Sequence, residues 1–475
     1  MSSYTISKKL NPNKVFILQK SEIEKRFDPF FYVPELLELE KIVSKKQPKK
    51  LRDYVISVSS GATPKTIELE KYYSDKENGI PFLRVQNLSS TGILEFEECK
   101  YINKATHNGM LKRSQVSEGD LLVKITGVGR MAVASVAPKN FVGNINQHVC
   151  VIKTNNIETS KFLASFLNSN IGEKLASRRS TGGTRPALDY PALLSIPIIE
   201  DKRIVEIANK SVEQKRINEE KAENILASID TYLLNQLGIV LPEKQENTLK
   251  NRMFTISISE LSGSRFDPNF NNLNHQTNIT SIKNSKYKVE NLKQITTQIF
   301  QGVGRNIDET SQFKLLKVKN IKRNCEIDYD EIEQIGIFSK DKILQKNDII
   351  TPCIGEAIRQ IKFAVFEKDS NLYLVDNNVG VIRPNERVNS MYLNYCLCNS
   401  IGRLQINRLI GGGGVPFLGS DNLKKFIVPL PPFEKQNEIA EHISEIRKQA
   451  QDLKDQTKLL LEKANKEIED ILLNT

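Results

Sequence analysis

The chain has 475 residues, too many for a single compact core, so two or more domains are expected. Hydrophobic residues make up 39% of the chain and charged residues 26%, which is ordinary for a folded globular protein and argues against long disordered stretches. Lys and Arg number 68 against 57 Asp and Glu, and the resulting net charge of +11 favours polyanionic partners.

The compartment is inferred from two features of the sequence. The opening MSSYTISKKLNPNK has no apolar core, and no apolar run approaches the roughly 20 residues that a membrane span needs. Six scattered cysteines form neither a disulfide framework nor a paired CxxC metal site. We interpret the CxC of Cys396 and Cys398 as two small residues on a buried apolar segment rather than a ligand pair. A reduced, cytoplasmic protein without a membrane partner is therefore expected.

The predicted elements fall into four regions. These are strands with loops, a long helix, strands with loops again, and a second long helix. Residues 1–198 contain short runs such as DLLVKITG and HVCVIK, rich in β-branched residues and bounded by Gly, Pro and Asn, which predict strands and loops. Residues 199–240 predict a long helix from about Glu200 to Leu237, with a polar middle at Lys215 and Asn218. Residues 241–430 again predict strands and loops. The apolar stripe of the helix runs through Ile204, Ala208, Ala222, Ile225, Ile229 and Tyr232.

Residues 431–475 predict a second long helix. Its apolar positions alternate spacings of four and three, which is the seam of a coiled coil. The seam runs through Ile439, Ile443, Ile446, Ala450, Leu453, Thr457, Leu460, Ala464, Glu467 and Ile471. Each long helix follows its domain in the sequence and cannot bury its whole apolar stripe inside that domain. We therefore expect the two helices to pack on each other as an antiparallel coiled coil with a pseudo-two-fold axis. The alternative is that each helix docks on an unrelated partner.

The sequence also repeats itself. RFDP at Arg26–Pro29 returns at Arg265–Pro268, and five further blocks recur in the same order. Their matched residues are Asn87 with Asn320, Gly127 with Gly355, Val149 with Val379, Pro186 with Pro416, and Ile207 with Ile439. The offset drifts by a few residues from block to block, as loop insertions would cause. The sequence therefore predicts an α+β protein with two duplicated strand-rich domains, each followed by a long helix.

This organisation resembles the specificity subunit of type I restriction-modification systems over nearly the whole chain. The features that carry the resemblance are the entry segments KRFDPFF and SRFDPNF, the pieces GDLLVKITGVGRMAVASV and NDIITPCIGEAIRQIKFAVF, and the exits TRPALDYPALLSIPIIEDKRIVE and VPFLGSDNLKKFIVPLPPFEKQNEIA. One departure is the first exit, SIPIIEDKR, which lacks the fuller proline pattern of Pro429, Pro431 and Pro432. This departure affects the geometry expected where the first domain joins the first long helix.

The resemblance implies a division of labour. Target-recognition domains at 1–198 and 241–430 would each bind one half of a bipartite, asymmetric double-stranded DNA site, and the helices at 199–240 and 431–475 would set the spacing. The helices would also dock two modification subunits, which bind S-adenosylmethionine and methylate adenine, and restriction subunits, the translocating endonucleases, would join through these. The chain itself would be a non-catalytic subunit for host defence that binds no cofactor or metal.

The competing hypothesis is catalysis by the chain itself, as a DNA methyltransferase. FQGVG at Phe300–Gly304 resembles a methyltransferase glycine loop, but Gly302 aligns with Gly61 of the first repeat, and no Asn/Asp-Pro-Pro-aromatic motif accompanies it. ITGVGR and IGGGG lack the Gly-Lys-Ser/Thr ending of a phosphate loop and predict tight turns. The pairs Glu213 with Lys215 and Glu219 with Lys221 have a nuclease-like spacing but lie on the helix, where they are expected to be solvated. The four histidines show no metal-ligand spacing.

The candidate DNA contacts are polar and basic residues beside the matched strands. Arg suits guanine, Asn or Gln suits adenine, and Lys suits phosphates. In the first domain they are Lys65, Arg84, Gln86, Asn87, Arg130, Gln147, His148, Arg178, Arg179 and Arg185, and in the second Arg305, Lys317, Lys319, Asn320, Arg359, Asn377, Asn378, Arg403 and Arg408. For Asn87 and Asn320 a turn-capping amide is an equal alternative, and a partly buried structural role is the alternative for His148.

Two other classes stay open. The chain could serve a related restriction system whose methylase and nuclease share one partner chain. It could also be a coiled-coil interaction protein without a DNA function, which the duplicated strand-rich domains argue against.

Overall fold

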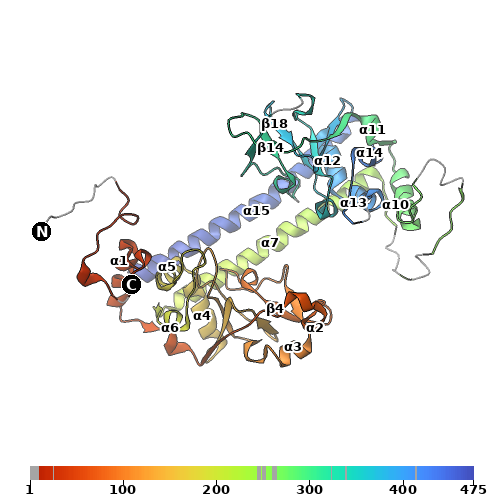
Figure 1. Ribbon diagram of the computed structural model, residues 1–475. Coiled ribbons are helices and arrows are strands. Elements are labelled where there is room, and N and C mark those ends of the chain that lie inside the picture. The colour runs from red at the N-terminus through yellow and green to blue at the C-terminus, as the bar shows by residue number, and fades with distance from the viewer. Residues whose placement is uncertain are drawn as a thin grey trace. The chain divides into compact units, whose positions relative to one another are not determined.

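The chain is described here from a computed structural model, which covers residues 10–24, 26–242, 248, 253–258, 265–322, 324–336, 340–411 and 414–474 (Figure 1). Its residues group into two compact units. Unit 1 comprises residues 1–219 and 454–475, and unit 2 comprises residues 220–453. Within the described residues, no helix is both long and apolar enough to cross a membrane.

Unit 1 contains two sheets, a strand pair and several helices. The four-stranded sheet has the order β2-β10-β7-β8, the five-stranded sheet β3-β5-β4-β9-β6, and β1 pairs with β11. The strands are β1 Lys49–Lys50, β2 Ser57–Ser60, β3 Tyr73–Ser74, β4 Ile80–Leu83, β5 Lys100–Ile102, β6 Gln115–Ser117, β7 Leu121–Lys124, β8 Ala134–Val136, β9 Val142–Ile145, β10 Val149–Lys153 and β11 Pro197–Ile198. The helices are α1 Pro34–Lys45, α2 Leu69–Tyr72, α3 Lys104–Asn108, α4 Ile157–Asn168, α5 Asn170–Arg179, α6 Tyr190–Leu194 and the first half of α7 Lys202–Leu237.

Unit 2 is built in the same manner. Its four-stranded sheet has the order β13-β19-β16-β17, its three-stranded sheet β15-β14-β18, and β12 pairs with β20. The strands are β12 Val289–Asn291, β13 Thr296–Gln301, β14 Lys314–Leu316, β15 Glu333–Gln334, β16 Ile349–Pro352, β17 Ala364–Val365, β18 Tyr373–Val375, β19 Val379–Pro384 and β20 Ile427–Pro429. The helices are α10 Leu273–Lys283, α11 Leu292–Ile295, α12 Ser390–Cys398, α13 Ser400–Leu409, α14 Ser420–Leu423, the second half of α7 and the first half of α15 Phe433–Asn474.

The four-stranded sheet of unit 1 is buried on both faces. Side chains of a strand alternate between faces, so neighbouring residues of β7 enter different cores. Leu121 packs in a cluster with Phe166 of α4, whereas Leu122 packs in a second cluster with Leu83 of the five-stranded sheet. In unit 2, β16 does the same, with Ile349 packed toward α12 and Ile350 toward the three-stranded sheet. A continuous apolar run such as LLV is therefore a strand between two layers.

The long helices begin and end close to the predicted positions. The first extends over Lys202–Leu237, and the second starts at Phe433 directly after the proline-rich exit. In unit 2, α7 packs with α13, because Asp230 accepts hydrogen bonds from the backbone nitrogen and Oγ of Ser400, both at 2.8 Å. This carboxylate satisfies donors at the N-terminus of α13, where helix dipole and free N–H groups favour negative charge.

In unit 1, Asn218 in the polar middle of α7 is buried, whereas Lys215 is partly exposed. Asn218 is 8% exposed and donates from Nδ2 to Oγ1 of Thr457 on α15 at 3.0 Å. Gln214 completes the pair by donating to Oδ1 of Asn218 at 2.9 Å. A buried amide that is satisfied by one partner residue on the facing helix favours a single register.

The predicted seam of the second helix is wrong at its end. Glu467 is exposed and Ile471 only partly buried, whereas Ile468 and Leu472 are buried. These two residues join the core cluster of unit 1 that also contains Leu39 and Val43 of α1. A strict alternation of four and three drifts against the 3.6 residues per turn of an α-helix, and here the last turns pack on α1.

Candidate nucleic-acid interface

Five loops of unit 1 meet at one end of its four-stranded sheet. β2 and β7 end there and β10 begins there, because Cys150 lies opposite Ser60 and Val149 opposite Lys124. Backbone hydrogen bonds tie the loops together, from Gly61 to Asn146, Ile125 to His148, Gly127 to Pro186 and Asn146 to Leu83. We call residues 61–65, 84–87, 125–130, 146–148 and 181–188 rim 1.

The corresponding loops of unit 2 meet in the same way. Their backbone hydrogen bonds run from Gly302 to Val379, Cys353 to Asn378, Gly355 to Pro416 and Asp376 to Leu316. We call residues 302–305, 317–320, 353–360, 376–378, 411 and 414–418 rim 2. Gly412 and Gly413 of the IGGGG motif, predicted to form a tight turn, lie outside the described residues.

Rim 1 brings together the predicted residues Lys65, Arg84, Gln86, Gln147, His148 and Arg185. Lys65, Gln86, Gln147 and Arg185 are exposed, and His148 is half-buried. Gln147 accepts a hydrogen bond from Thr63, and its amide lies 3.3 Å from Nε2 of His148. Among the described residues, Lys65 and Arg185 form no ion pair. Their charges are therefore open to an anion.

Rim 2 brings together Arg305, Lys317, Lys319, Arg359, Asn377 and Asn378, but acids sit beside its cations. Glu333 pairs with Arg305 at 2.8 Å and also with Lys317, and these cations hold its pKa below the ordinary value, Lys317 most of all. Lys319 pairs with Glu331 at 2.9 Å and Arg359 with Glu356 at 3.3 Å. Burial raises the pKa of the Asp376 carboxyl beside Asn377. A phosphate at rim 2 would have to compete with these carboxylates.

Asn87 and Asn320 brace turns. Asn87 is fully buried, accepts from the Arg84 backbone nitrogen at 2.9 Å and donates to the Glu95 carbonyl at 2.9 Å. Asn320 does the same with the Lys317 nitrogen and the Asp328 carbonyl, both at 2.9 Å. The turn-capping alternative therefore describes both amides, which fix the turns that present Arg84 and Lys317.

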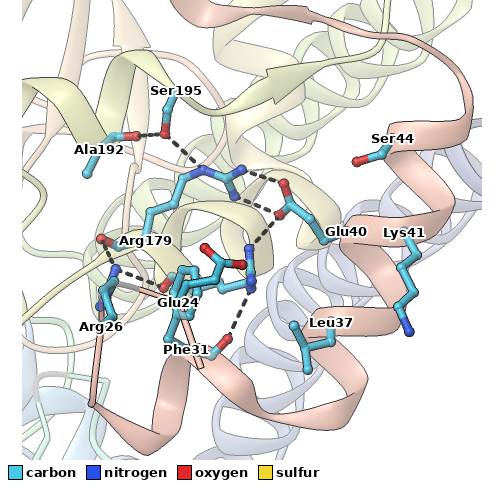
Figure 2. Close-up of a pocket in the computed structure, with 11 residues that line it drawn as sticks. Glu24, Arg26, Phe31, Leu37, Glu40, Lys41, Ser44, Arg179, Ala192 and Ser195 are labelled. Atoms are coloured by element: carbon cyan, nitrogen blue, oxygen red, sulfur yellow. Dashed lines mark hydrogen bonds and ion pairs between the residues drawn. The ribbon is translucent and has the colours of Figure 1, made fainter. Parts of the chain in front are cut away.

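Arg178 and Arg179 lie at the end of α5, just before the last loop of rim 1, but their guanidinium groups bind Phe31 and Glu40. Arg178 is 5% exposed, donates to the Phe31 carbonyl at 3.1 Å and stacks 3.9 Å from the Phe31 ring centroid. Figure 2 shows Arg179 facing Glu40 of α1, which accepts from both of its terminal nitrogens, at 2.9 and 2.5 Å. Burial lowers the pKa of Arg178. Both guanidinium groups are engaged within the unit, at a cavity of about 580 Å³.

The RFDP motif completes this brace in each unit. Arg26 donates to the Arg179 carbonyl at 3.0 Å (Figure 2) and to the Ser180 carbonyl at 2.7 Å. These carbonyls end α5 and have no acceptor role inside the helix. Arg265 donates in the same manner to the carbonyls of Leu409 and Ile410 at the end of α13. The motif that marks the repeat is thus a helix C-cap.

The remaining predicted residues are Arg408, Arg130 and Arg403, and only Arg130 lies on a rim loop. Arg408 donates to the Phe270 carbonyl at 3.0 Å and stacks 4.0 Å from its ring centroid, matching Arg178 with Phe31. Arg130, on the Gly-Val-Gly loop of rim 1, binds Asn170 at 3.0 Å and the Asn168 carbonyl, and burial lowers its pKa. Arg403 is exposed on α13.

Sequence reasoning missed two lysines that shape the rims. Lys124, at the end of β7, is 4% exposed and donates to the Val128 carbonyl at 2.7 Å, which holds the Gly-Val-Gly loop. Lys342 donates to the carbonyls of Gln301 at 2.9 Å and Gly302 at 3.1 Å. Lys124 stands in an apolar strand, and a charged residue in such a run is the signal that could have found it.

The residues considered above as candidates for catalysis have structural roles. Gly302 is a loop residue of rim 2, as the repeat predicts, and Glu213 pairs with Arg216 at 2.8 Å on the helix surface. Across the described part of the chain, no group of three or more His, Cys, Asp or Glu residues could hold a metal ion.

Gly302 permits a close backbone approach in rim 2, and Gly304 in the same loop gives a matched test. A Cβ on Gly302 would lie 2.0 Å from the Val375 carbonyl oxygen, whereas a Cβ on Gly304 would meet nothing within 4 Å. We expect Gly302→Ala to lower the free energy of unfolding by about 1–3 kcal/mol, because the backbone of the loop has to move. Gly304→Ala should leave it within about 0.5 kcal/mol. Chemical denaturation of both variants checks this, and equal effects would contradict the close approach.

Comparisons with known proteins find one family match and several similar solved structures. Residues 306–463 match the family described as type I restriction modification DNA specificity domain. The chain is similar at 14% identity to the HsdS subunit from Thermoanaerobacter tengcongensis, with 89% of this chain and 95% of that one covered and a TM-score of 0.32. It is similar at 14% to the S subunit of a type I restriction-modification system from M. genitalium, with 90% and 94% covered and a TM-score of 0.35.

A third solved structure comes from a description of complex assembly and conformational transition of the type I R-M system. Its identity to this chain is 14%, 90% of this chain and 95% of that one are covered, and the TM-score is 0.45. The match of residues 306–463 to this domain family confirms the predicted resemblance to specificity subunits of type I restriction-modification systems.

Proposed function

We propose that the chain is the sequence-specific DNA-binding subunit of a type I restriction-modification complex. Each unit would bind one half of a bipartite asymmetric site through its rim. The observation that carries this proposal is the presence of two sets of matched loops at the same end of two sheets with corresponding strand order. Loops held by a rigid sheet are suited to place side chains against base edges.

We further infer that the units arose by duplication and that α7 and α15 form an antiparallel coiled coil. Support comes from within each unit. In unit 1, Asn218 of α7 pairs with Thr457 of α15. In unit 2, the ring centroids of Tyr232 on α7 and His442 on α15 lie 4.1 Å apart. From the first pair to the second, the position on α7 rises from 218 to 232 while the position on α15 falls from 457 to 442, as an antiparallel pairing requires. The helices would fix the separation of the half-sites.

The partners follow from this proposal. They are double-stranded DNA, two modification subunits that dock on the helices and carry S-adenosylmethionine, and restriction subunits, all in the cytoplasm. The chain would supply recognition without a catalytic group or cofactor of its own. Methylome sequencing of the host with and without this gene tests the function, and loss of one bipartite adenine motif is expected. An unchanged methylome in a strain whose partner subunits are expressed would exclude the proposal.

The different charge environments of the rims predict unequal effects on binding. Removing the unpaired cations with Lys65→Ala and Arg185→Ala should weaken DNA binding by the assembled complex about tenfold or more near physiological salt and reduce the salt slope by about two. Arg305→Ala should weaken it less, because its charge is already offset by Glu333. Glu333→Gln should strengthen binding, because two cations are released toward phosphates.

Titration of binding over a salt series measures each effect. The matched control is Lys139→Ala, an exposed lysine in the loop after β8, at the end of the four-stranded sheet where β7 begins and so opposite rim 1. If the control weakened binding as much as Arg185→Ala, rim 1 would not be the contact surface.

A further inference from the structure

Two cysteines from distant parts of the unit 2 sequence meet in the fold. The Sγ atoms of Cys325 and Cys398 lie 2.7 Å apart, across 73 positions of sequence. This separation is about 0.7 Å longer than a disulfide bond. Cys325 lies in a tight turn closed by the bridge between Ile321 and Ile327, and Cys398 is the last residue of α12.

The surroundings of the two thiols differ. Arg447 of α15 donates to Sγ of Cys325 at 3.5 Å, and Cys398 lies 3.3 Å from the Phe363 carbonyl oxygen. The hydrogen bond from Cys398 and the charge of Arg447 lower the pKa of Cys325, whereas burial raises the pKa of Cys398. Cys325 is thus the thiol that is more readily ionised, and the thiolate is the nucleophilic form of cysteine.

The pair differs in exposure from three other cysteines of the chain. Cys150, Cys353 and Cys396 are buried in cores, and burial raises their pKa values to about 12. Cys325 and Cys398 both retain partial exposure. The CxC segment therefore splits its two thiols, with Cys396 in the core and Cys398 at the turn.

We propose that Cys325 and Cys398 form an oxidation site that closes to an intrachain disulfide on exposure to a peroxide. Forming the disulfide requires a two-electron acceptor, which the peroxide supplies. The proposal concerns thiol chemistry and stands independently of the DNA-binding function.

The chemistry proceeds in two balanced steps. The Cys325 thiolate attacks one oxygen of hydrogen peroxide, the O–O bond breaks, and with one proton the products are a sulfenic acid on Cys325 and water. The Cys398 thiol then attacks that sulfur, forming the S–S bond and releasing the sulfenic oxygen as a second water. Two thiols lose two electrons in total, and hydrogen peroxide accepts them.

The bond would tether the turn at 321–327 to α12. This turn directly follows Asn320, which braces the Lys317 turn of rim 2. Oxidation would therefore restrict the motion of this turn relative to α12. Slower hydrogen exchange of the 321–327 amides is the expected structural signature.

The experiment uses the purified full chain treated with a small excess of hydrogen peroxide. Thiol titration in denaturant should fall by two from the six cysteines of the chain. Peptide mass spectrometry without reductant should find Cys325 joined to Cys398, and hydrogen exchange in 321–327 should slow. Cys325→Ser and Cys398→Ser should each abolish the joined peptide. The matched control Cys99→Ser, which replaces another partly exposed cysteine, should leave it unchanged.

Two outcomes would overturn the proposal. One is the absence of the joined peptide from oxidised protein that remains folded by circular dichroism. The other is formation of the joined peptide at equal rate in denatured protein, which would show that the fold does not bring the thiols together. Because the readouts are covalent linkage and exchange, they do not depend on DNA binding.

Discussion

Insertion of one heptad between Glu219 and Glu220 of α7 is expected to widen the gap of the methylated motif by up to about three base pairs. Seven residues add about 10 Å to a helix at 1.5 Å per residue, and B-DNA rises about 3.4 Å per base pair. The recognised bases should stay the same because neither rim is altered. Genome-wide methylome sequencing of the mutant measures the gap directly.

A two-residue insertion at the same place is the matched control. Two extra residues rotate the following part of α7 by about 200°. Asn218 and Ala222 then no longer lie on the same buried face of the helix. A heptad insertion keeps both residues on that face. The buried bond from Asn218 to Thr457 makes this stretch sensitive to phase. We expect the two-residue variant to lose assembly and methylation. An unchanged gap in an active heptad variant would show that the helices do not set the spacing.

Exchange of residues 253–430 for those of a related chain is expected to change one half of the methylated motif and to leave the other half and the gap intact. The exchanged segment must carry both β12 and β20, because these strands pair with each other. It should also keep a serine at the position of Ser400, since Asp230 of the retained α7 caps α13 through that residue. The methylome of the chimera reports the result.

The control for this exchange restores the protein's own residues 253–430 in the same cloning frame and should restore the original motif. The two-rim model predicts that the half retained by the chimera is the one bound by unit 1. A change in both halves would refute independent recognition by the two units. Loss of all methylation with intact assembly would mean that the exchanged rim cannot support binding, and a second donor would then decide.

The regular elements were predictable because their signals are local. The first helix was expected from about Glu200 to Leu237 and extends over Lys202–Leu237, since its spacing and flanking residues are contained in its own sequence. The end of the second seam was not predictable. Whether Glu467 or Ile468 is buried depends on α1, more than 400 residues earlier, and no periodicity within α15 reveals that partner.

The candidate site was predictable as loops but not as individual side chains. Arg179 and Arg185 are the same residue type a few positions apart, yet Arg179 meets Glu40 and Arg185 is exposed. The difference arises from a partner 139 positions away. Conversely, Lys124 was passed over because its sequence context is a strand, although its side chain holds the rim 1 loop. Which of the exposed side chains contact bases stays a prediction.

Unit 1 takes its core from both ends of the chain. Ile468 and Leu472 of α15 pack with Leu39 and Val43, and Lys46 donates to the Leu472 carbonyl at 2.8 Å. During synthesis, residues 220–453 are therefore complete before unit 1 is, which reverses the usual order in which the N-terminal domain folds first. A stop codon that removed only the last two turns of α15 would leave the core of the N-terminal region open, although no residue in that region had changed.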